Sequence, residues 1–153
     1  MGLRIYIAGP ITGMKKGDVM SYWDRANKKF TKMGYQVFSP MTGKGYFRTD
    51  NPNDKFKPAG ENSHSPISSD HAIAHRDMWM VSTVDVVYVN LFKSEKVSIG
   101  CVSEIAWAKA FGKHIVVAME EGNIHNHAFI KENATIVFPT VEEAENYLSL
   151  LVK

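Results

Sequence analysis

Residues 85–91 read Asp-Val-Val-Tyr-Val-Asn-Leu, and this stretch decides the fold class. Its run of branched and aromatic side chains is typical of a β-strand that is buried on both faces, as the strands of parallel sheets are. A second run, at residues 4–8, stops at Gly9 and Pro10, which is the pattern of a buried strand that ends in a loop. Both stretches therefore predict strands of the protein core.

Segments with helical periodicity separate the expected strands. Apolar residues recur every three or four positions in residues 18–33, 69–84 and 98–111. Gly34 and Gly112 are stop signals for two of these helices, and Ser98 is the expected N-cap of the last. The other expected elements are strands at residues 35–38, 114–119 and 135–138 and a final helix at residues 141–152, capped by Thr140. This alternation predicts an α/β fold with a doubly wound, Rossmann-like or flavodoxin-like sheet of five parallel strands, with helices on both faces.

Length and composition describe one globular domain over residues 1–153, since a domain has about 150 residues. Hydrophobic residues make up 44%, enough for a core, and the net charge of +2 is too small to indicate a surface for polymeric nucleic acid. The one cysteine, Cys101, excludes an internal disulfide. The longest apolar run, residues 115–119, is far shorter than the ~20 residues of a membrane helix. The N-terminus does not have the pattern of a signal peptide, so we expect a cytoplasmic protein that does not enter membranes.

Residues 41–68 interrupt the alternation of strands and helices. Glycine and proline recur there, at Gly43, Gly45, Pro52, Pro58, Gly60 and Pro66. This composition predicts a long loop. A stretch of this length without secondary structure is usually a lid, a binding loop or a disordered segment, so residues 41–68 are a candidate active-site lid.

Two carboxylates stand on apolar helix faces. The neighbours of Glu104 three and four positions away are Gly100, Cys101, Trp107 and Ala108. Helical side chains lean toward the N-terminus, so Glu104 reaches over the turn of Gly100, where a missing side chain leaves space for a substrate. Asp77 also has apolar helical neighbours. Such a pair can divide labour, one attacking a sugar anomeric carbon while the other handles the proton of the leaving group. The alternative is that each acid pairs with a buried cation or backbone donors and is structural.

Other chemistries have weaker signals. His71 and His75 have a spacing that can hold a metal, and His125 and His127 lie close in sequence, but no third ligand is specified and we expect no metal. Cys101 lacks a recognisable histidine partner motif for nucleophilic catalysis. The loop of residues 9–13 follows a strand yet matches neither the Walker motif nor the dinucleotide fingerprint.

Six motifs, in their order and spacing, resemble the nucleoside 2-deoxyribosyltransferase family. They are Ile5-Tyr-Ile-Ala-Gly-Pro-Ile11, His75-Arg-Asp77, Asp85-Val-Val-Tyr-Val-Asn90, Ser98-Ile-Gly-Cys-Val-Ser-Glu-Ile-Ala-Trp107, Gly112-Lys-His-Ile-Val-Val117 and Asn123-Ile-His-Asn-His127. Together they cover nearly the whole chain except the long loop. No single motif is diagnostic, and the specificity lies in the combination.

The resemblance implies roles for three residues. Glu104 falls at the position of the family's nucleophile, which attacks C1′ of a 2′-deoxyribose, and Asp77 matches the acid that protonates the leaving base. Tyr6 matches the tyrosine that orients the nucleophile, although a tyrosine in this strand could also be simple core. The resemblance further implies a homo-oligomer without a cofactor, whose partners are a nucleoside or nucleotide and a free nucleobase.

Ser98 departs from the transferase pattern. Transferases that act on free nucleosides usually have an aspartate six residues before the nucleophile, whereas the related 2′-deoxynucleoside 5′-monophosphate N-hydrolases resemble this chain in having serine there. A serine at a helix N-terminus suits a phosphate. Those hydrolases also use a serine and an arginine in the first loop, where this chain has Pro10 and Thr12. The residues left to replace the missing charge are Lys15, Lys16, Lys44 and Arg48.

We expect transfer of a deoxyribosyl group from a 2′-deoxynucleoside to another base through a covalent intermediate on Glu104. The alternatives are hydrolysis of 2′-deoxynucleoside 5′-monophosphates and a non-catalytic nucleotide-binding module. Ligands of doubly wound sheets bind outside the carboxyl ends of the strands. The substrate-binding candidates are Gly9, Pro10, Thr12, Asp85, Asn90, Ser98 and Gly100. For Asp85 the position at a helix-to-strand junction by itself favours a plain turn or cap role.

Overall fold

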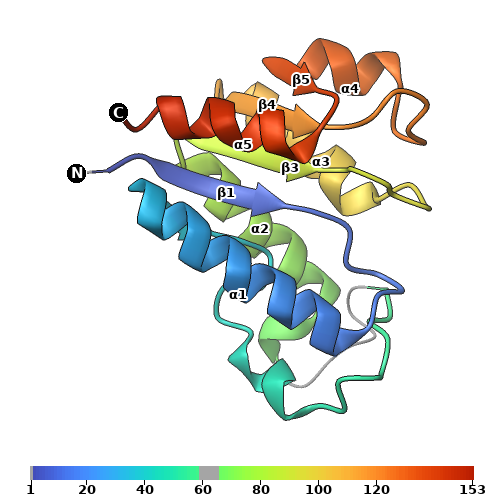
Figure 1. The fold of residues 1–153 in the computed structure, drawn as a ribbon. Coiled ribbons are helices and arrows are strands. Elements are labelled where there is room, and N and C mark those ends of the chain that lie inside the picture. The colour runs from blue at the N-terminus through green and yellow to red at the C-terminus, as the bar shows by residue number, and fades with distance from the viewer. Residues whose placement is uncertain (1, 59–65) are drawn as a thin grey trace.

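The computed structural model describes residues 2–58 and 66–153. The elements in chain order are β1 (Arg4–Ala8), α1 (Lys16–Met33), β2 (Gln36–Phe38), α2 (Asp70–Thr83), β3 (Val86–Asn90), α3 (Ile99–Ala110), β4 (His114–Ala118), α4 (Ala128–Asn133), β5 (Ile136–Phe138) and α5 (Val141–Leu150). Among the described residues between β2 and α2 lie the 3₁₀ turns η1 (Gly45–Thr49) and η3 (Pro66–Ser68). All strand pairs are parallel, in the order β2-β1-β3-β4-β5 (Figure 1). The predicted fold class is therefore confirmed, and this order is the flavodoxin-like one.

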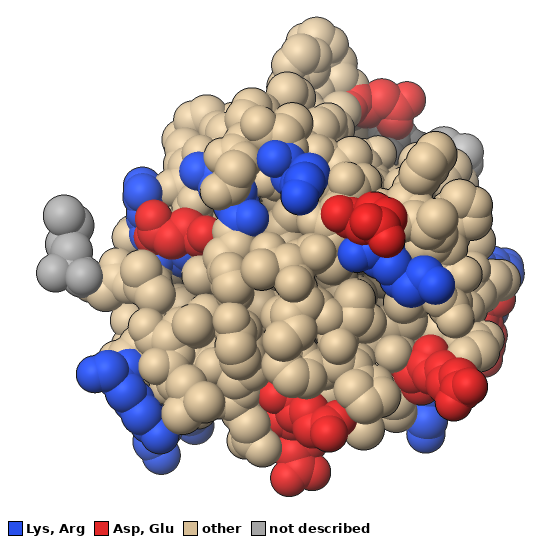
Figure 2. Space-filling model, turned by 90° about the horizontal axis from the view of Figure 1, so that it is seen from above, with Lys and Arg blue, Asp and Glu red and all other residues tan. Residues whose placement is uncertain are grey.

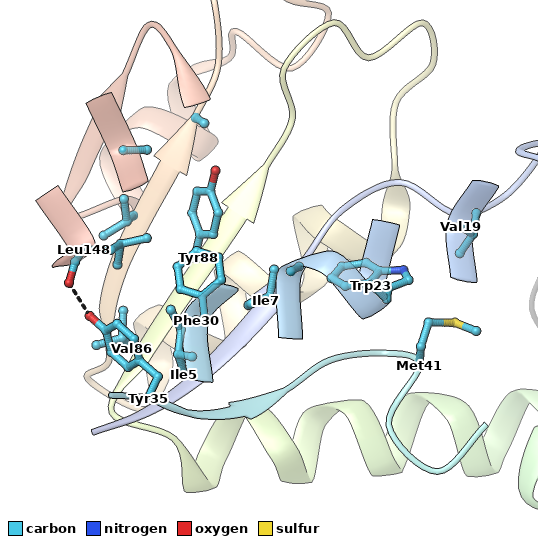
Figure 3. Packing of buried hydrophobic residues seen from close by; sticks show 14 of the residues in the cluster. Ile5, Ile7, Val19, Trp23, Phe30, Tyr35, Met41, Val86, Tyr88 and Leu148 are labelled. Carbon is cyan, nitrogen blue, oxygen red and sulfur yellow. Dashed lines mark hydrogen bonds between the residues drawn. The ribbon is translucent and has the colours of Figure 1, made fainter. Parts of the chain in front are cut away.

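The helices cover both faces of the sheet (Figure 1). Successive side chains of a strand point to opposite faces, so Ile5 and Ile7 pack with α1 and α5, whereas Tyr6 and Ala8 pack with α2 and α3. Figure 3 shows the first of these two clusters, in which the Tyr35 hydroxyl donates to the carbonyl oxygen of Leu148 over 2.7 Å. The alternation of β1 thus directs Tyr6 toward α3.

Local sequence signals set most helix ends. The Ser98 hydroxyl accepts from the backbone N–H of Cys101 at the start of α3, and Thr140 accepts from Glu143 at the start of α5. Gly34 ends α1 with a φ of 112°, a left-handed conformation that suits glycine. The short helix α4 was not expected. Its six residues are too few to show a period, and its N-cap is the side chain of His127, which accepts from Phe129.

The described part of the long loop that follows β2, residues 41–58, is packed rather than structureless. Its backbone pairs with the segment after β1: Gly13 donates to Phe56, Phe56 to Met14, Lys16 to Asp54 and Gly17 to Pro52, over 2.7–3.0 Å. The rings of Phe47 and Phe56 are buried. Residues 41–58 are therefore ordered and pack beside the start of α1. Gly60, one of the expected loop residues, lies outside the described residues, and the lid role stays a prediction.

Charged side chains of both signs are mixed on the face shown in Figure 2. Neither sign gathers there into the continuous stripe that tracks a phosphate backbone. Within residues 2–58 and 66–153, no helix combines the length and apolar character needed to cross a membrane.

Gly17 tests the packing of the loop on α1. A Cβ at this position would lie 2.7 Å from the Cβ of Pro52 and 3.2 Å from its carbonyl oxygen. We expect Gly17→Ala to lower the free energy of unfolding by about 1–3 kcal/mol, as overpacking does. The measurement is urea denaturation, with Gly45→Ala as control because nothing lies within 4 Å of a Cβ there. Equal midpoints for the two variants would contradict this contact.

Candidate active site

A hydrogen bond between β1 and α3 forms the centre of the site. The Tyr6 hydroxyl donates to Oε1 of Glu104 over 2.7 Å, across 98 positions of sequence. Tyr6 is fully buried and Glu104 is 4% exposed. The structure thus brings together two of the three predicted catalytic residues. Within the described residues no donor reaches the second oxygen, Oε2, which is left available for chemistry.

Burial controls the protonation of this pair. Desolvation raises the pKa of Glu104 to about 8, and the nearby charge of Asp77 acts in the same direction. The hydrogen bond from Tyr6 and the charge of Lys44 oppose this rise. The pKa of Tyr6 is itself raised well above its ordinary value, by burial first and by the Glu104 charge second. Tyr6 therefore stays a hydroxyl donor throughout the pH range in which Glu104 ionises.

Asp77 faces the same region from α2. It is 8% exposed, and burial raises its pKa against the opposing effects of Lys44 and Arg76. Arg76 donates to Oδ1 of Asp77 from Nη2 over 2.9 Å and from Nε over 3.2 Å. A structural role for Asp77, in which a cation pairs with the acid, therefore accounts for Oδ1. No hydrogen bond from a described residue reaches the other oxygen, Oδ2. The free oxygen can carry and deliver a proton.

Lys44 is the functional candidate whose position the sequence did not reveal. It lies in the turn before η1, is 6% exposed, and interacts electrostatically with Asp77 and Glu104. Burial lowers its pKa to about 8. Sequence reasoning named it only as one of four cations that could replace a missing charge. A buried lysine in a glycine-rich turn has no periodicity to identify it, and only the three-dimensional packing sets it beside the carboxylates.

Residues at the carboxyl ends of the strands frame the other side of the site. The side-chain amide of Asn90 donates to the Tyr22 hydroxyl over 3.1 Å, and a Cβ on Gly9 would lie 3.5 Å from the Asn90 carbonyl oxygen. Nothing lies within 4 Å of a Cβ built on Gly100, so the space one turn before Glu104 is open, as expected. The backbone N–H of Ser98 donates to Nε2 of His125 over 2.8 Å, so only its hydroxyl can serve a ligand.

The first loop and Asp85 complete the set of sequence candidates. Pro10 is half-buried and Thr12 exposed in the loop after β1, at the carboxyl end of the sheet. Asp85 lies at the other end of the sheet, directly before β3, where it accepts from the Arg4 backbone N–H over 2.8 Å. This hydrogen bond lowers the pKa of Asp85. The assignment of Asp85 to substrate binding is corrected accordingly, because it lies one strand length away from Asn90 and fixes the start of the sheet.

Two other chemistries considered from the sequence were nucleophilic catalysis by Cys101 and metal binding by histidines. Burial, with the charge of Glu104, raises the pKa of the Cys101 thiol, which keeps it protonated and a poor nucleophile. The rings of His71 and His75 lie 4.0 Å apart between centroids. In the part of the chain that the structure describes, no three histidine, cysteine or acidic side chains gather in a way that could hold a metal.

Comparison with known proteins identifies the family to which the chain belongs. The model of the nucleoside 2-deoxyribosyltransferase family matches residues 5–147. The chain therefore belongs to this family of enzymes. No curated protein sequence matches the chain significantly.

Solved structures show the same fold at low sequence identity. A 2-deoxyribosyltransferase from Bacillus psychrosaccharolyticus has a TM-score of 0.63 and 17% identity, with 94% of this chain and 91% of that chain covered. A 2-deoxyribosyltransferase from Leishmania mexicana has a TM-score of 0.61 and 18% identity, covering 97% of both chains. A CMP N-glycosidase from Clostridium botulinum has a TM-score of 0.57 and 18% identity, covering 97% of this chain and 98% of that one.

The raised pKa of Glu104 predicts a pH-dependent stability. The folded protein holds this proton up to about pH 8, whereas an unperturbed glutamate has a pKa of 4.5. The contribution of the neutral carboxyl to stability is therefore full below about pH 4.5 and is lost as the pH rises through about 8. Glu104→Gln removes this dependence, so we expect its Tm advantage over the wild type to grow by at least ~3 °C between pH 5 and pH 9.

Thermal unfolding followed by circular dichroism at both pH values measures this effect. Glu132→Gln, an exposed position in α4, is the matched control and should follow the wild type at each pH. The same pH trend for both variants would contradict the burial of a titrating Glu104.

Proposed function

We propose that the protein cleaves the N-glycosidic bond of 2′-deoxynucleosides and transfers the deoxyribosyl group to another nucleobase, with Glu104 as the nucleophile. The observation that carries the proposal is the Tyr6–Glu104 hydrogen bond beside the open space at Gly100. The hydrogen bond holds one carboxylate oxygen and leaves the other without a donor among the described residues, one helical turn from the open space at Gly100. A purely structural carboxylate would have both oxygens satisfied.

The reaction proceeds in two balanced steps. Oε2 of Glu104 bonds to C1′ while the C1′–N bond breaks, and the electron pair of that bond goes to the departing base. Asp77 supplies a proton to the base nitrogen and becomes a carboxylate. A second base then attacks C1′, returns its proton to Asp77 and releases Glu104. Two inversions at C1′ retain its configuration.

Hydrolysis of 2′-deoxynucleoside 5′-monophosphates is the second candidate, and Ser98 is the observation that favours it. The hydroxyl of Ser98 at the N-terminus of α3 carries no charge to repel a phosphate, and a helix N-terminus attracts anions. The similar fold of a CMP N-glycosidase also supports hydrolysis of a nucleoside monophosphate. In this case water takes the place of the second base. A homo-oligomer in the cytoplasm remains our prediction in both cases.

The products distinguish the two candidates. Chromatography would follow base release from 2′-deoxynucleosides and their 5′-monophosphates, each with and without a second free base. We expect a new nucleoside only when the second base is present. Free base from monophosphates alone would establish the hydrolase instead.

Glu104→Ala tests the mechanism in the same assay. We expect loss of turnover with the fold unchanged, because no other described carboxylate accepts the Tyr6 hydroxyl. Mass spectrometry of wild-type protein mixed with substrate should show a deoxyribosyl adduct that the variant lacks. A Glu104→Ala protein that keeps most of its activity would refute covalent catalysis by this residue.

Tyr6→Phe tests the hydrogen bond. The carboxylate form of Glu104 attacks, so kcat/KM should rise with pH toward about 8, the pKa of Glu104. The hydrogen bond from Tyr6 lowers this pKa. Its loss should therefore move the rising part of the curve of kcat/KM against pH, the rising limb, to higher pH. At pH 7 we expect a fall of about 10- to 100-fold, the value of a hydrogen bond to a charged group. An unchanged rising limb would show that Tyr6 is only core.

A further inference from the structure

Lys44 is a buried cation that forms no ion pair with any described residue. Its backbone is fixed in a turn, where its N–H donates to Met41 and its carbonyl oxygen accepts from Phe47. Among the described residues, no side chain or carbonyl group accepts a hydrogen bond from its ammonium group or forms an ion pair with it. A buried charge is costly unless it is paired, so the ammonium group is adapted to a partner that enters from outside.

The other cations considered as replacement charges differ from Lys44. Lys16 pairs with Asp50 over 2.5 Å, and Arg48 holds Asp24 through two hydrogen bonds. Lys15 is exposed. Within residues 2–58 and 66–153, Lys44 is thus the one of these four cations that is both buried and unpaired.

The surroundings of Lys44 place it on the side of the leaving base. Nη2 of Arg76 donates to the Pro40 carbonyl oxygen over 2.9 Å and ties the turn that contains Lys44 to α2. The charges that act on Lys44 are those of Arg76, Asp77 and Glu104. In the proposed function Asp77 is the acid of the departing base. The Lys44 ammonium group therefore lies near the place of that base.

We propose that the Lys44 ammonium group is a further catalytic residue that binds a carbonyl oxygen of the departing base. This inference rests on the proposed function and names its substrate class: 2′-deoxynucleosides of bases with a carbonyl oxygen conjugated to the glycosidic nitrogen, such as the 2-oxopyrimidines. When the C1′–N bond breaks, part of the electron pair moves onto that oxygen. The ammonium group stabilises this charge and keeps its proton, while Asp77 protonates the nitrogen.

Lys44→Met tests the assignment, because methionine has a similar length and no charge. Loss of the Lys44 charge raises the pKa of Glu104 and so lowers kcat/KM for every substrate. Beyond this shared loss, we expect kcat/KM to fall about 10- to 100-fold further for 2′-deoxyuridine, the value of a hydrogen bond to a charged group, than for 2′-deoxyadenosine, whose base has no carbonyl oxygen. The loss should be smaller for 5-fluoro-2′-deoxyuridine than for 2′-deoxyuridine, since fluorine already stabilises the departing anion. Lys44→Arg should retain most of the activity with all three substrates.

Controls separate this role from others. Lys28→Met, at an exposed position of α1, should behave as wild type, and thermal unfolding should show that Lys44→Met is folded. An equal loss with 2′-deoxyuridine and 2′-deoxyadenosine, or a loss confined to 5′-monophosphates, would overturn the assignment, as would a wild-type enzyme that releases adenine but no uracil. Wild-type protein that releases no base from any nucleoside or monophosphate would overturn the proposed function itself.

Discussion

A carboxylate enclosed between a strand and a helix is the constraint on which the site depends. Glu104 is 4% exposed, and the one hydrogen bond it receives within the described part of the chain comes from Tyr6. Taking a charge out of water costs several kcal/mol, so the surroundings decide whether it stays ionised. Tyr6 and Lys44 favour the carboxylate, whereas burial and Asp77 oppose it. The resulting pKa of about 8 keeps the group near the point where it can gain or lose a proton.

The sheet makes this arrangement possible. β1 and β3 are adjacent and parallel, with Tyr6 opposite Val87, and α2 and α3 cover the face to which both side chains point. Because side chains alternate, a shift of one residue in β1 would send Tyr6 into the α1 face. The buried strands therefore fix the phenol relative to α3, and the sheet that stabilises the fold also positions the Tyr6–Glu104 pair.

Local signals explain how much could be predicted from the sequence. Branched strands, helical periods, N-caps and glycine stops gave the five strands and the four longer helices, and apolar helix faces singled out Glu104 and Asp77. Asp85 was included among the binding candidates although its position favoured a turn or cap role, since a residue that precedes a parallel strand lies at the amino end of that strand. The position of Lys44 could not be predicted, because it depends on the Arg76–Pro40 hydrogen bond between segments 36 positions apart. The same holds for residues 41–58, which are ordered by backbone pairing with residues 13–17.

The net charge of the four ionisable groups of the site stays constant during the first step of the proposed reaction. Before the first step Glu104 is a carboxylate and Asp77 carries a proton, while Lys44 and Arg76 are cations. After the step Glu104 is a neutral ester, and Asp77 has lost its proton to the base. One negative charge has moved from α3 to α2, and the net charge of the site is unchanged. A fixed cation that acts on both positions can stabilise both states with little reorganisation, which is the condition under which a buried site lowers a barrier. Since Lys44 acts on both Glu104 and Asp77, it meets this condition without moving.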